Sequence, residues 1–300
     1  MLITSATLNA LRTGFATQFQ NNFDNAPSVL SQIATVVPST TKSNTYGWLG
    51  QWPGMREWVG DRVLKDISEH AYAITNKDWE SSVGVKRTDI EDDQLGVYMP
   101  LMAEMGRAAA VYPDEHAFAL LKAGDSTLCY DGQNFFDTDH PVFANADGTG
   151  AATTVSNMAA GAGPAWFLMD TSRSLRPLIF QNRKSPVFTS MTGNEDEAVF
   201  TKNEYRFGVD ARSAVGFGFW QQAYMSKADL TPENFEAAFA AMGSIKANGG
   251  RPMNVKATVL VVPPSLRAKA LAITKSEFRV GGESNVNSGV VETLVTPWVL

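Results

Sequence analysis

Four of the seven tryptophans of this 300-residue chain lie in one charged segment, residues 46–87, and this clustering strongly constrains the fold. They are Trp48, Trp52, Trp58 and Trp79, and no hydrophobic run in the segment is long enough to enclose them. Burying an indole removes a large apolar area from water, so these side chains need a covering surface. That surface is either another layer of the same chain or a neighbouring subunit, because interfaces favour tryptophan. Both interpretations stay open at this point.

Composition excludes several classes of protein. Hydrophobic residues make up 44% of the chain and charged residues 19%, which is typical of a globular protein with one large domain or two interleaved ones. The net charge of −6 argues against a nucleic-acid binder with a broad basic face. The single cysteine, Cys129, rules out an internal disulfide framework and fits a reducing compartment. We also expect no secretion signal and no membrane span, and therefore a soluble cytoplasmic product.

The N-terminus shows the spacing of an amphipathic helix. Its apolar residues recur every three or four positions and are Leu8, Leu11, Phe15, Phe19 and Phe23. Ser5 is the expected N-cap, and residues 25–27 end the helix. Such a helix must dock on its own body or on a neighbour. We therefore add Phe15 and Phe19 to the four tryptophans of residues 46–87 as candidates for inter-subunit contacts.

A second helical pattern begins near Asp92 and continues to Tyr112. Pro100 lies inside it and predicts a kink or a delayed start, while Pro113 predicts a break before another helical piece over 114–123. Strand patterns dominate after residue 165, with a further helix capped by Thr231. Strands and helices occur in blocks without strict alternation, so the fold class is α+β.

Five stretches, taken in order, resemble the major head subunit family of Mu-like phages and prophages. They are residues 72–80, 83–93, 112–115, 130–141 and 177–181. The most diagnostic is the block at 130–141, YDGQNFFDTDHP, which contains the pattern Asp-Gly-Gln-x-Phe-Phe-x-x-x-His-Pro. The likeness extends over nearly the whole chain.

This resemblance implies an HK97-like major capsid fold with four regions. Residues 1–44 would be the N-terminal helix and arm, and 45–91 an extended loop of two long strands. Residues 92–124 would hold the spine helix and peripheral domain. Residues 125–300 would form the axial domain with returning peripheral strands.

The implied function is that of a major capsid protein, not an enzyme. Copies would assemble as pentamers and hexamers into the icosahedral head of a tailed phage or prophage. That head would enclose double-stranded DNA without sequence-specific contact and without a membrane. Scaffold, portal and maturation protease are the implied assembly partners. The protein would be found in the virion, and in the host cytoplasm during assembly.

Two other functions remain as alternatives. A hydrolase could use Cys129 with His140 and Asp139, because a Cys–His pair can form a nucleophile and Asp with His can hold a metal. The three histidines are far apart in sequence, however, and Asp-Gly and His-Pro steps are ordinary turn chemistry. We therefore expect no catalytic, cofactor-binding or metal-binding residues. A minor virion or decoration component is the other alternative, although such proteins are usually shorter.

Overall fold

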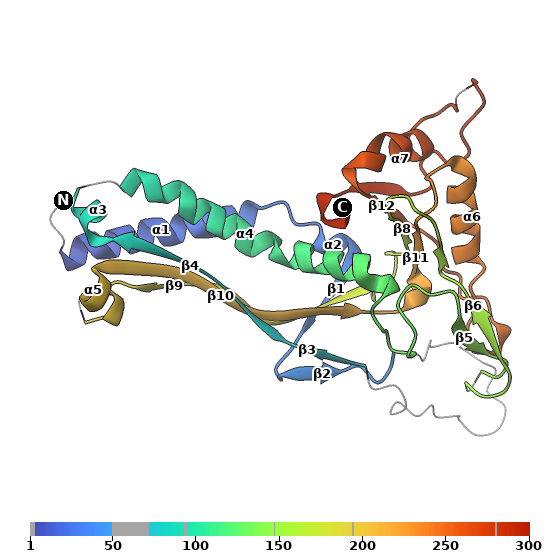
Figure 1. Ribbon diagram of the computed structural model, residues 1–300, viewed down its shortest axis with the longest axis horizontal. Helices are drawn as coiled ribbons and strands as arrows, with labels where there is room; N and C mark the ends of the chain where they lie inside the picture. Colours follow the sequence, from blue (N-terminus) through green and yellow to red (C-terminus); the bar gives the residue numbers. More distant parts are fainter. Residues whose placement is uncertain (1–3, 50–71, 93–94, 147, 194, 280) are drawn as a thin grey trace.

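Two strands of fourteen residues each, β9 (Leu178–Met191) and β10 (Glu204–Phe217), run antiparallel through the molecule. At about 3.3 Å per residue each spans roughly 46 Å. The structure, a computed structural model, describes residues 4–49, 72–92, 95–146, 148–193, 195–279 and 281–300. Figure 1 shows an elongated part built along these strands and a second, broader part at the end where β9 begins and β10 finishes. The mixture of separate helices and sheets confirms the α+β class.

The elongated part is a four-stranded sheet covered by two helices. The strand order is β1 (Ala34–Pro38), β9, β10 and β4 (Lys77–Lys86). Strand β4 pairs with β10 over its whole length. Helices α1 (Ser5–Asn25) and α4 (Leu95–Lys122) lie side by side along this sheet (Figure 1).

Helix α1 begins one residue earlier than its predicted cap. The cap is Thr4, not Ser5, because Thr4 and Thr7 form a reciprocal pair. The backbone N–H of Thr7 donates to Thr4 Oγ1 at 3.2 Å, and the backbone N–H of Thr4 donates to Thr7 Oγ1 at 2.8 Å. This arrangement satisfies two otherwise free donors at the helix start.

The apolar face of α1 is buried inside the same chain. Phe15 and Phe19, two of the predicted inter-subunit contact residues, are 0% and 1% exposed, so their own chain covers both rings. Phe15 packs edge-on against Phe207 with ring centroids 4.9 Å apart, and Phe19 lies 5.3 Å from Phe188. The four-stranded sheet supplies the cover that the sequence pattern left unassigned.

Helix α4 continues through both of its prolines. The predicted break at Pro113 and the delayed start at Pro100 are wrong, because the helix runs unbroken from residue 95 to 122. An interior proline costs about 3 kcal/mol, but burying one large apolar side chain contributes about 1.5–3 kcal/mol. The buried residues are Met102, Met105 and Ala109 before Pro113, and Ala117, Phe118 and Leu121 after it. Packing into two separate cores, one on each side of Pro113, therefore stabilises the helix across the proline.

Helices α1 and α4 approach each other closely at Gly106. A Cβ atom at this position would lie 2.2 Å from the backbone oxygen of Phe19. Any larger residue would push the two helices apart, so this position requires glycine.

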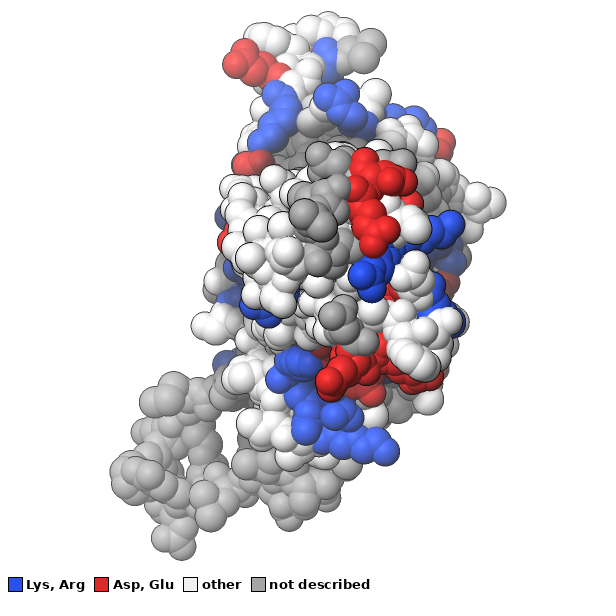
Figure 2. All heavy atoms as spheres, turned by 90° about the vertical axis from the view of Figure 1, so that its left-hand side faces the viewer, with Lys and Arg blue, Asp and Glu red and all other residues white. Residues whose placement is uncertain are grey.

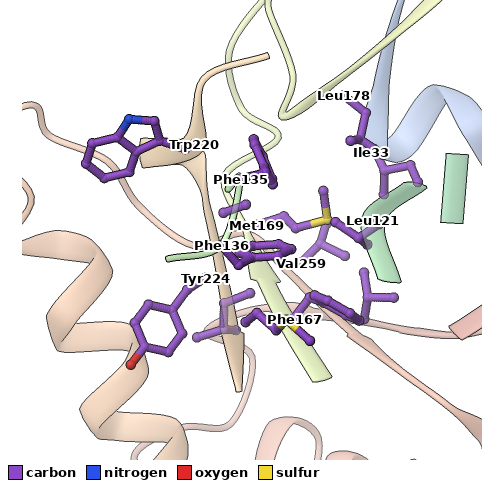
Figure 3. Close-up of a cluster of buried hydrophobic side chains, with 14 of the residues drawn as sticks. Ile33, Leu121, Phe135, Phe136, Phe167, Met169, Leu178, Trp220, Tyr224 and Val259 are labelled. Atoms are coloured by element: carbon purple, nitrogen blue, oxygen red, sulfur yellow. The ribbon is translucent and has the colours of Figure 1, made fainter. Parts of the chain in front are cut away.

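The broader part is built on a five-stranded sheet. Its order is β13 (Glu292–Val295), β12 (Val259–Val262), β8 (Trp166–Met169), β11 (Ala223–Ser226) and β7 (Met158–Ala159). Helices α6 (Pro232–Gly243) and α7 (Arg267–Thr274) pack against it. The predicted cap of α6 is confirmed, since Thr231 Oγ1 accepts from the N–H of Asn234 at 3.2 Å. Figure 3 shows the centre of this core, where Phe135, Phe136, Phe167 and Met169 meet.

Short elements complete the chain. They are α2 (Leu30–Ile33), α3 (Arg87–Glu91), α5 (Glu197–Lys202), β2 (Ser43–Thr45), β3 (Ala73–Thr75), β5 (His140–Phe143) and β6 (Ala152–Val155). Among the described residues, no helix is both long enough and apolar enough to cross a membrane.

Replacing Phe15 by alanine should lower the free energy of unfolding of the unassembled subunit by about 3–5 kcal/mol, because it leaves a cavity in a closed core. The exposed Gln18→Ala variant on the same helix should change it by no more than about 0.5 kcal/mol. Denaturant titration of both variants measures the difference. If Phe15→Ala were as stable as Gln18→Ala but failed to assemble, Phe15 would be an interface residue after all.

Candidate assembly interface

The predicted extended loop leaves and re-enters the body at one place. Strands β2 and β3 pair antiparallel, with Ser43 opposite Thr75 and Thr45 opposite Ala73. Both ends of the segment that joins them, residues 46–72, therefore lie at this strand pair, and we call this segment the excursion. Trp52 and Trp58 fall in this excursion, outside the described residues. Strand β4, which the predicted loop over 45–91 includes, pairs with β10 in the four-stranded sheet.

A buried polar network fixes the base of this excursion. Gln181 is fully buried on β9 and accepts from the hydroxyl of Tyr46 at 2.9 Å. Its amide donates to Asn76 Oδ1 at 2.8 Å and to the backbone oxygen of Ile74 at 3.1 Å. The amide of Asn76 in turn donates to Ser39 Oγ at 2.9 Å. Because such groups are costly to bury unpaired, the network holds both ends of the excursion against the sheet.

Trp48 stands at the start of the excursion and is only partly covered by its own chain. Its ring makes edge contacts with Tyr46 at 6.0 Å and Phe219 at 6.1 Å between centroids. The side chain remains 40% exposed. An indole left this open is available to a neighbouring surface.

Trp79 lies on β4 and is half-buried against α4. Its ring stacks on His116 with centroids 3.9 Å apart, and its indole N–H donates to the backbone oxygen of Ser213 at 3.2 Å. Burial lowers the pKa of His116, so the imidazole is neutral at pH 7 and stacks as an uncharged ring. The same chain therefore covers one side of Trp79.

The other side of Trp79 faces an open groove of about 340 Å³ between β4, α4 and the residues near 298. Its walls are mostly apolar and include Ala108, Val111, Tyr112, Pro186 and Trp298. A second hollow of about 490 Å³ shares Glu115 and Trp298 with the first and continues along α4. Trp298 is 39% exposed. Sequence reasoning did not select Trp298, because it lies far from the tryptophan-rich segment in the chain.

Other large apolar side chains are exposed along both parts of the molecule. They are Val36, Val97, Leu101, Leu128, Val187, Met191, Phe200, Phe278, Val286 and Leu300. Phe200, on α5 at the far end of the elongated part, is the most exposed at 86%. Figure 2 views the molecule from this end and shows basic and acidic side chains next to one another. This mixed surface resembles a protein–protein contact more than a nucleic-acid-binding face.

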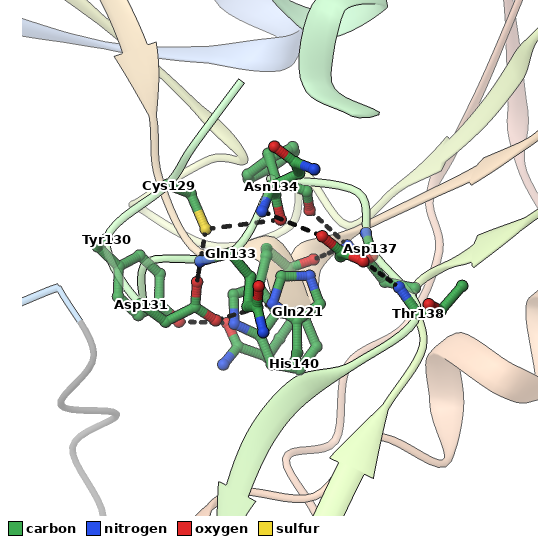
Figure 4. Close-up of polar contacts among 12 residues, drawn as sticks. Cys129, Tyr130, Asp131, Gln133, Asn134, Asp137, Thr138, His140 and Gln221 are labelled. Carbon is green, nitrogen blue, oxygen red and sulfur yellow. Dashed lines mark hydrogen bonds and ion pairs between the residues drawn. The ribbon is translucent and has the colours of Figure 1, made fainter. Parts of the chain in front are cut away.

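The diagnostic block at residues 130–141 forms a tightly bonded loop (Figure 4). Asp131 lies between Cys129 and His140. The thiol of Cys129 donates to Asp131 Oδ1 at 3.0 Å, and His140 Nδ1 lies 2.7 Å from Asp131 Oδ2. The His140 ring is fully buried and stacks on Trp220 with centroids 3.9 Å apart.

This arrangement does not activate Cys129 as a nucleophile. Burial, together with the negative charge of Asp131, raises the pKa of the Cys129 thiol well above its ordinary value. Burial also acts to raise the pKa of Asp131, but hydrogen bonds from His140 and Cys129 hold it below its usual value. The partner of the pair is Asp131 and not Asp139, which is exposed. A protonated, buried thiol is inert, because the thiolate is the reactive form.

The block also fills the core. Phe135 stacks on Phe217 with centroids 4.1 Å apart, and Phe136 lies 5.6 Å from Phe167. The side-chain amide of Asn157 donates to the backbone oxygen of Phe135 at 2.8 Å, and this hydrogen bond anchors the loop. The residues that mark the resemblance are therefore structural.

Comparison with known proteins decides the family. Residues 8–299 match the family model of the Mu-like prophage major head subunit gpT. This chain belongs to that family. It is similar to the Mu-like prophage FluMu major head subunit of Haemophilus influenzae, with 48% identity over 281 residues, covering 92% of this chain and 91% of that protein. It is 45% identical over 291 residues to the major capsid protein of Escherichia phage Mu, covering 96% of this chain and 95% of that protein.

Solved structures give the same result for the fold. A chain of the procapsid of bacteriophage JBD30 aligns with a TM-score of 0.87 and 58% identity, covering 99% of this chain and all (100%) of that one. A chain of the JBD30 capsid aligns with a TM-score of 0.76 and 45% identity, covering 100% of both chains. This member of the Mu-like major head subunit family thus has the HK97-like capsid fold. It is a structural protein of the phage head that self-assembles into a shell, not an enzyme.

In this Mu-like head subunit, Cys129 should resist alkylation while the chain is folded. Iodoacetamide should react on the order of 100-fold or more slowly than with the same protein in denaturant, and should stay slow as the pH rises from 7 to 9, because the raised pKa keeps the thiol protonated. Mass spectrometry over time measures the rate on this single cysteine. Rapid labelling of the native subunit at pH 7 would contradict the proposed burial and protonation.

Proposed function

We propose that the tryptophans of this capsid subunit seal contacts between neighbouring copies in the shell. Trp48 and Trp79 are the described candidates, and Trp52 and Trp58 are candidates within the excursion between β2 and β3. Two observations support the proposal: Trp48 is 40% exposed, and Trp79 lines an open groove.

The groove beside Trp79 supports a heterologous contact. It combines Trp79, Tyr112 and Trp298 with the small side chains of α4, so it presents a concave apolar surface to a partner. A closed shell requires each copy to offer one surface and receive a different one. In this proposal the excursion supplies one of these surfaces and the groove receives it.

Each fully buried ring would contribute a few kcal/mol before the cost of ordering, at about 25 cal/mol per Å² of apolar area. A single contact of this size is weak. Repetition over a whole shell makes the assembly stable collectively, while single subunits stay soluble enough to assemble.

The remaining partners follow from the same role. We infer that scaffold, portal and maturation protease act during assembly in the host cytoplasm, and that the shell encloses double-stranded DNA without sequence-specific contact. The net charge of −6 and the mixed charges of Figure 2 favour enclosure over tight binding. One JBD30 structure is described as a capsid decorated with minor capsid protein trimers, and it aligns with a TM-score of 0.77. A decoration partner is therefore a further candidate for this chain.

The Trp52→Ala/Trp58→Ala double variant tests the proposal. The described residues form two closed cores, and we expect the isolated double variant to keep its thermal unfolding midpoint and its circular dichroism spectrum. Particle formation, measured by negative-stain microscopy and sedimentation, should fall sharply. The Trp52→Phe/Trp58→Phe variant is the matched control and should still assemble, because it retains most of the apolar area.

Two outcomes would contradict this account. An isolated double variant that unfolds would place the rings in the core of its own subunit. A double variant that assembles as well as the parent would show that these rings are not anchors.

A further inference from the structure

Cys129, Asp131 and His140 bring three different metal-ligand types together in one buried place. One ligand atom from each residue can be chosen so that all three lie within 4.8 Å of one another. Cys129 is 6% exposed and His140 is fully buried, while Asp131 is partly covered (Figure 4). Neither the head-subunit function nor the assembly contacts use this cluster.

We propose that this cluster is a zinc site that clips the loop 129–140 to the start of β5. The ligands are Cys129 Sγ, one carboxylate oxygen of Asp131 and His140 Nδ1. Three protein ligands leave a fourth, tetrahedral position, which a water molecule fills. The role is structural, because the site fastens the loop that carries Phe135 and Phe136 into the core.

The distances fit a tetrahedral site after small side-chain movements. Zinc binds sulfur at about 2.3 Å and nitrogen or oxygen at about 2.0–2.2 Å, so neighbouring ligand atoms lie about 3.5 Å apart. Asp131 Oδ1 lies 3.0 Å from Cys129 Sγ and Asp131 Oδ2 lies 2.7 Å from His140 Nδ1, so the carboxylate must rotate to place one oxygen between both partners. The widest separation in the cluster, at most 4.8 Å, must close by about 1 Å.

The mixture of donors selects the metal. Magnesium and calcium require several oxygen ligands, and a thiolate with an imidazole does not supply them. Sulfur, nitrogen and carboxylate oxygen in one tetrahedral set suit zinc.

Binding moves protons in a defined way. The thiol of Cys129 loses its proton to solvent and the thiolate binds the metal. His140 binds as the tautomer with its ring proton on Nε2, and Asp131 binds as the carboxylate. The metal replaces the hydrogen bonds that Asp131 makes with its two neighbours. Zinc affinity should therefore rise with pH as the thiol proton becomes easier to remove.

The purified full-length subunit, stripped of metal, tests the site with Co²⁺ as a probe. One equivalent per chain should produce a tetrahedral spectrum with a thiolate-to-cobalt charge-transfer band, and Zn²⁺ should displace it. Cys129→Ser should abolish the band, and His140→Gln should abolish one-to-one binding. The matched control is Asp139→Asn in the same block, which should bind as the parent does because Asp139 is exposed and outside the cluster.

A second readout does not depend on the variants folding. Added Zn²⁺ should raise the thermal unfolding midpoint of the parent subunit by about 2 °C or more at saturation, and a chelator should reverse the shift. Absence of the charge-transfer band in the parent, with no zinc in assembled particles by elemental mass spectrometry, would overturn the proposal. Retention of one equivalent of zinc by Cys129→Ser would equally overturn it.

Discussion

Strands β9 and β10 take part in both hydrophobic cores, and the other elements are placed relative to them. The start of β9 is buried in the larger core through Leu178, Ile179 and Phe180. Phe207 and Val209 of β10 are buried in the smaller core beneath α1 and α4. Because the same backbone hydrogen-bond ladder passes through both cores, the elongated part and the broader part cannot turn independently without breaking it. A shell subunit needs this stiffness to hold its contact surfaces at fixed angles.

The two cores also explain which apolar surface is left for other copies. Phe15 and Phe19 face the four-stranded sheet and are sealed within the chain, whereas Trp48 and Trp298 remain 40% and 39% exposed. The polar network around Gln181 holds Tyr46 and Asn76 against the sheet, so the two ends of the excursion have defined positions. The subunit thus buries its two cores by itself but leaves large apolar side chains exposed at its surface.

Much of the fold could be predicted from the sequence, because local residue patterns determine several of its helices and strands. The helix over residues 5–25, the cap at Thr231 and the strands after residue 165 follow from spacing and turn chemistry alone. The family followed from the ordered stretches around 72–93 and 130–141. Helix α4 did not follow, since local rules end a helix at Pro113 and only packing on both sides of that residue carries it further.

The surface that contacts other subunits was also harder to predict, because tertiary packing decides which apolar side chains stay exposed. A phenylalanine on an amphipathic helix looks the same in the sequence whether its own sheet or a neighbouring subunit covers it. Phe15 is covered by the sheet of its own chain. Trp298 and Trp79 are separated by more than 200 residues, so only the tertiary fold reveals their shared groove. Asp131 was likewise overlooked beside His140, because Asp139 is adjacent in sequence while Asp131 is adjacent in space.

The central claim is that apolar surface exposed on one subunit becomes covered by other copies in the shell. A cryo-electron microscopy reconstruction of particles assembled from this chain measures this directly, residue by residue. The account predicts that Trp48, Trp298 and the groove beside Trp79 lie against neighbouring subunits and lose most of the exposure they have in the single chain. A well-resolved shell in which those indoles still face solvent would contradict it.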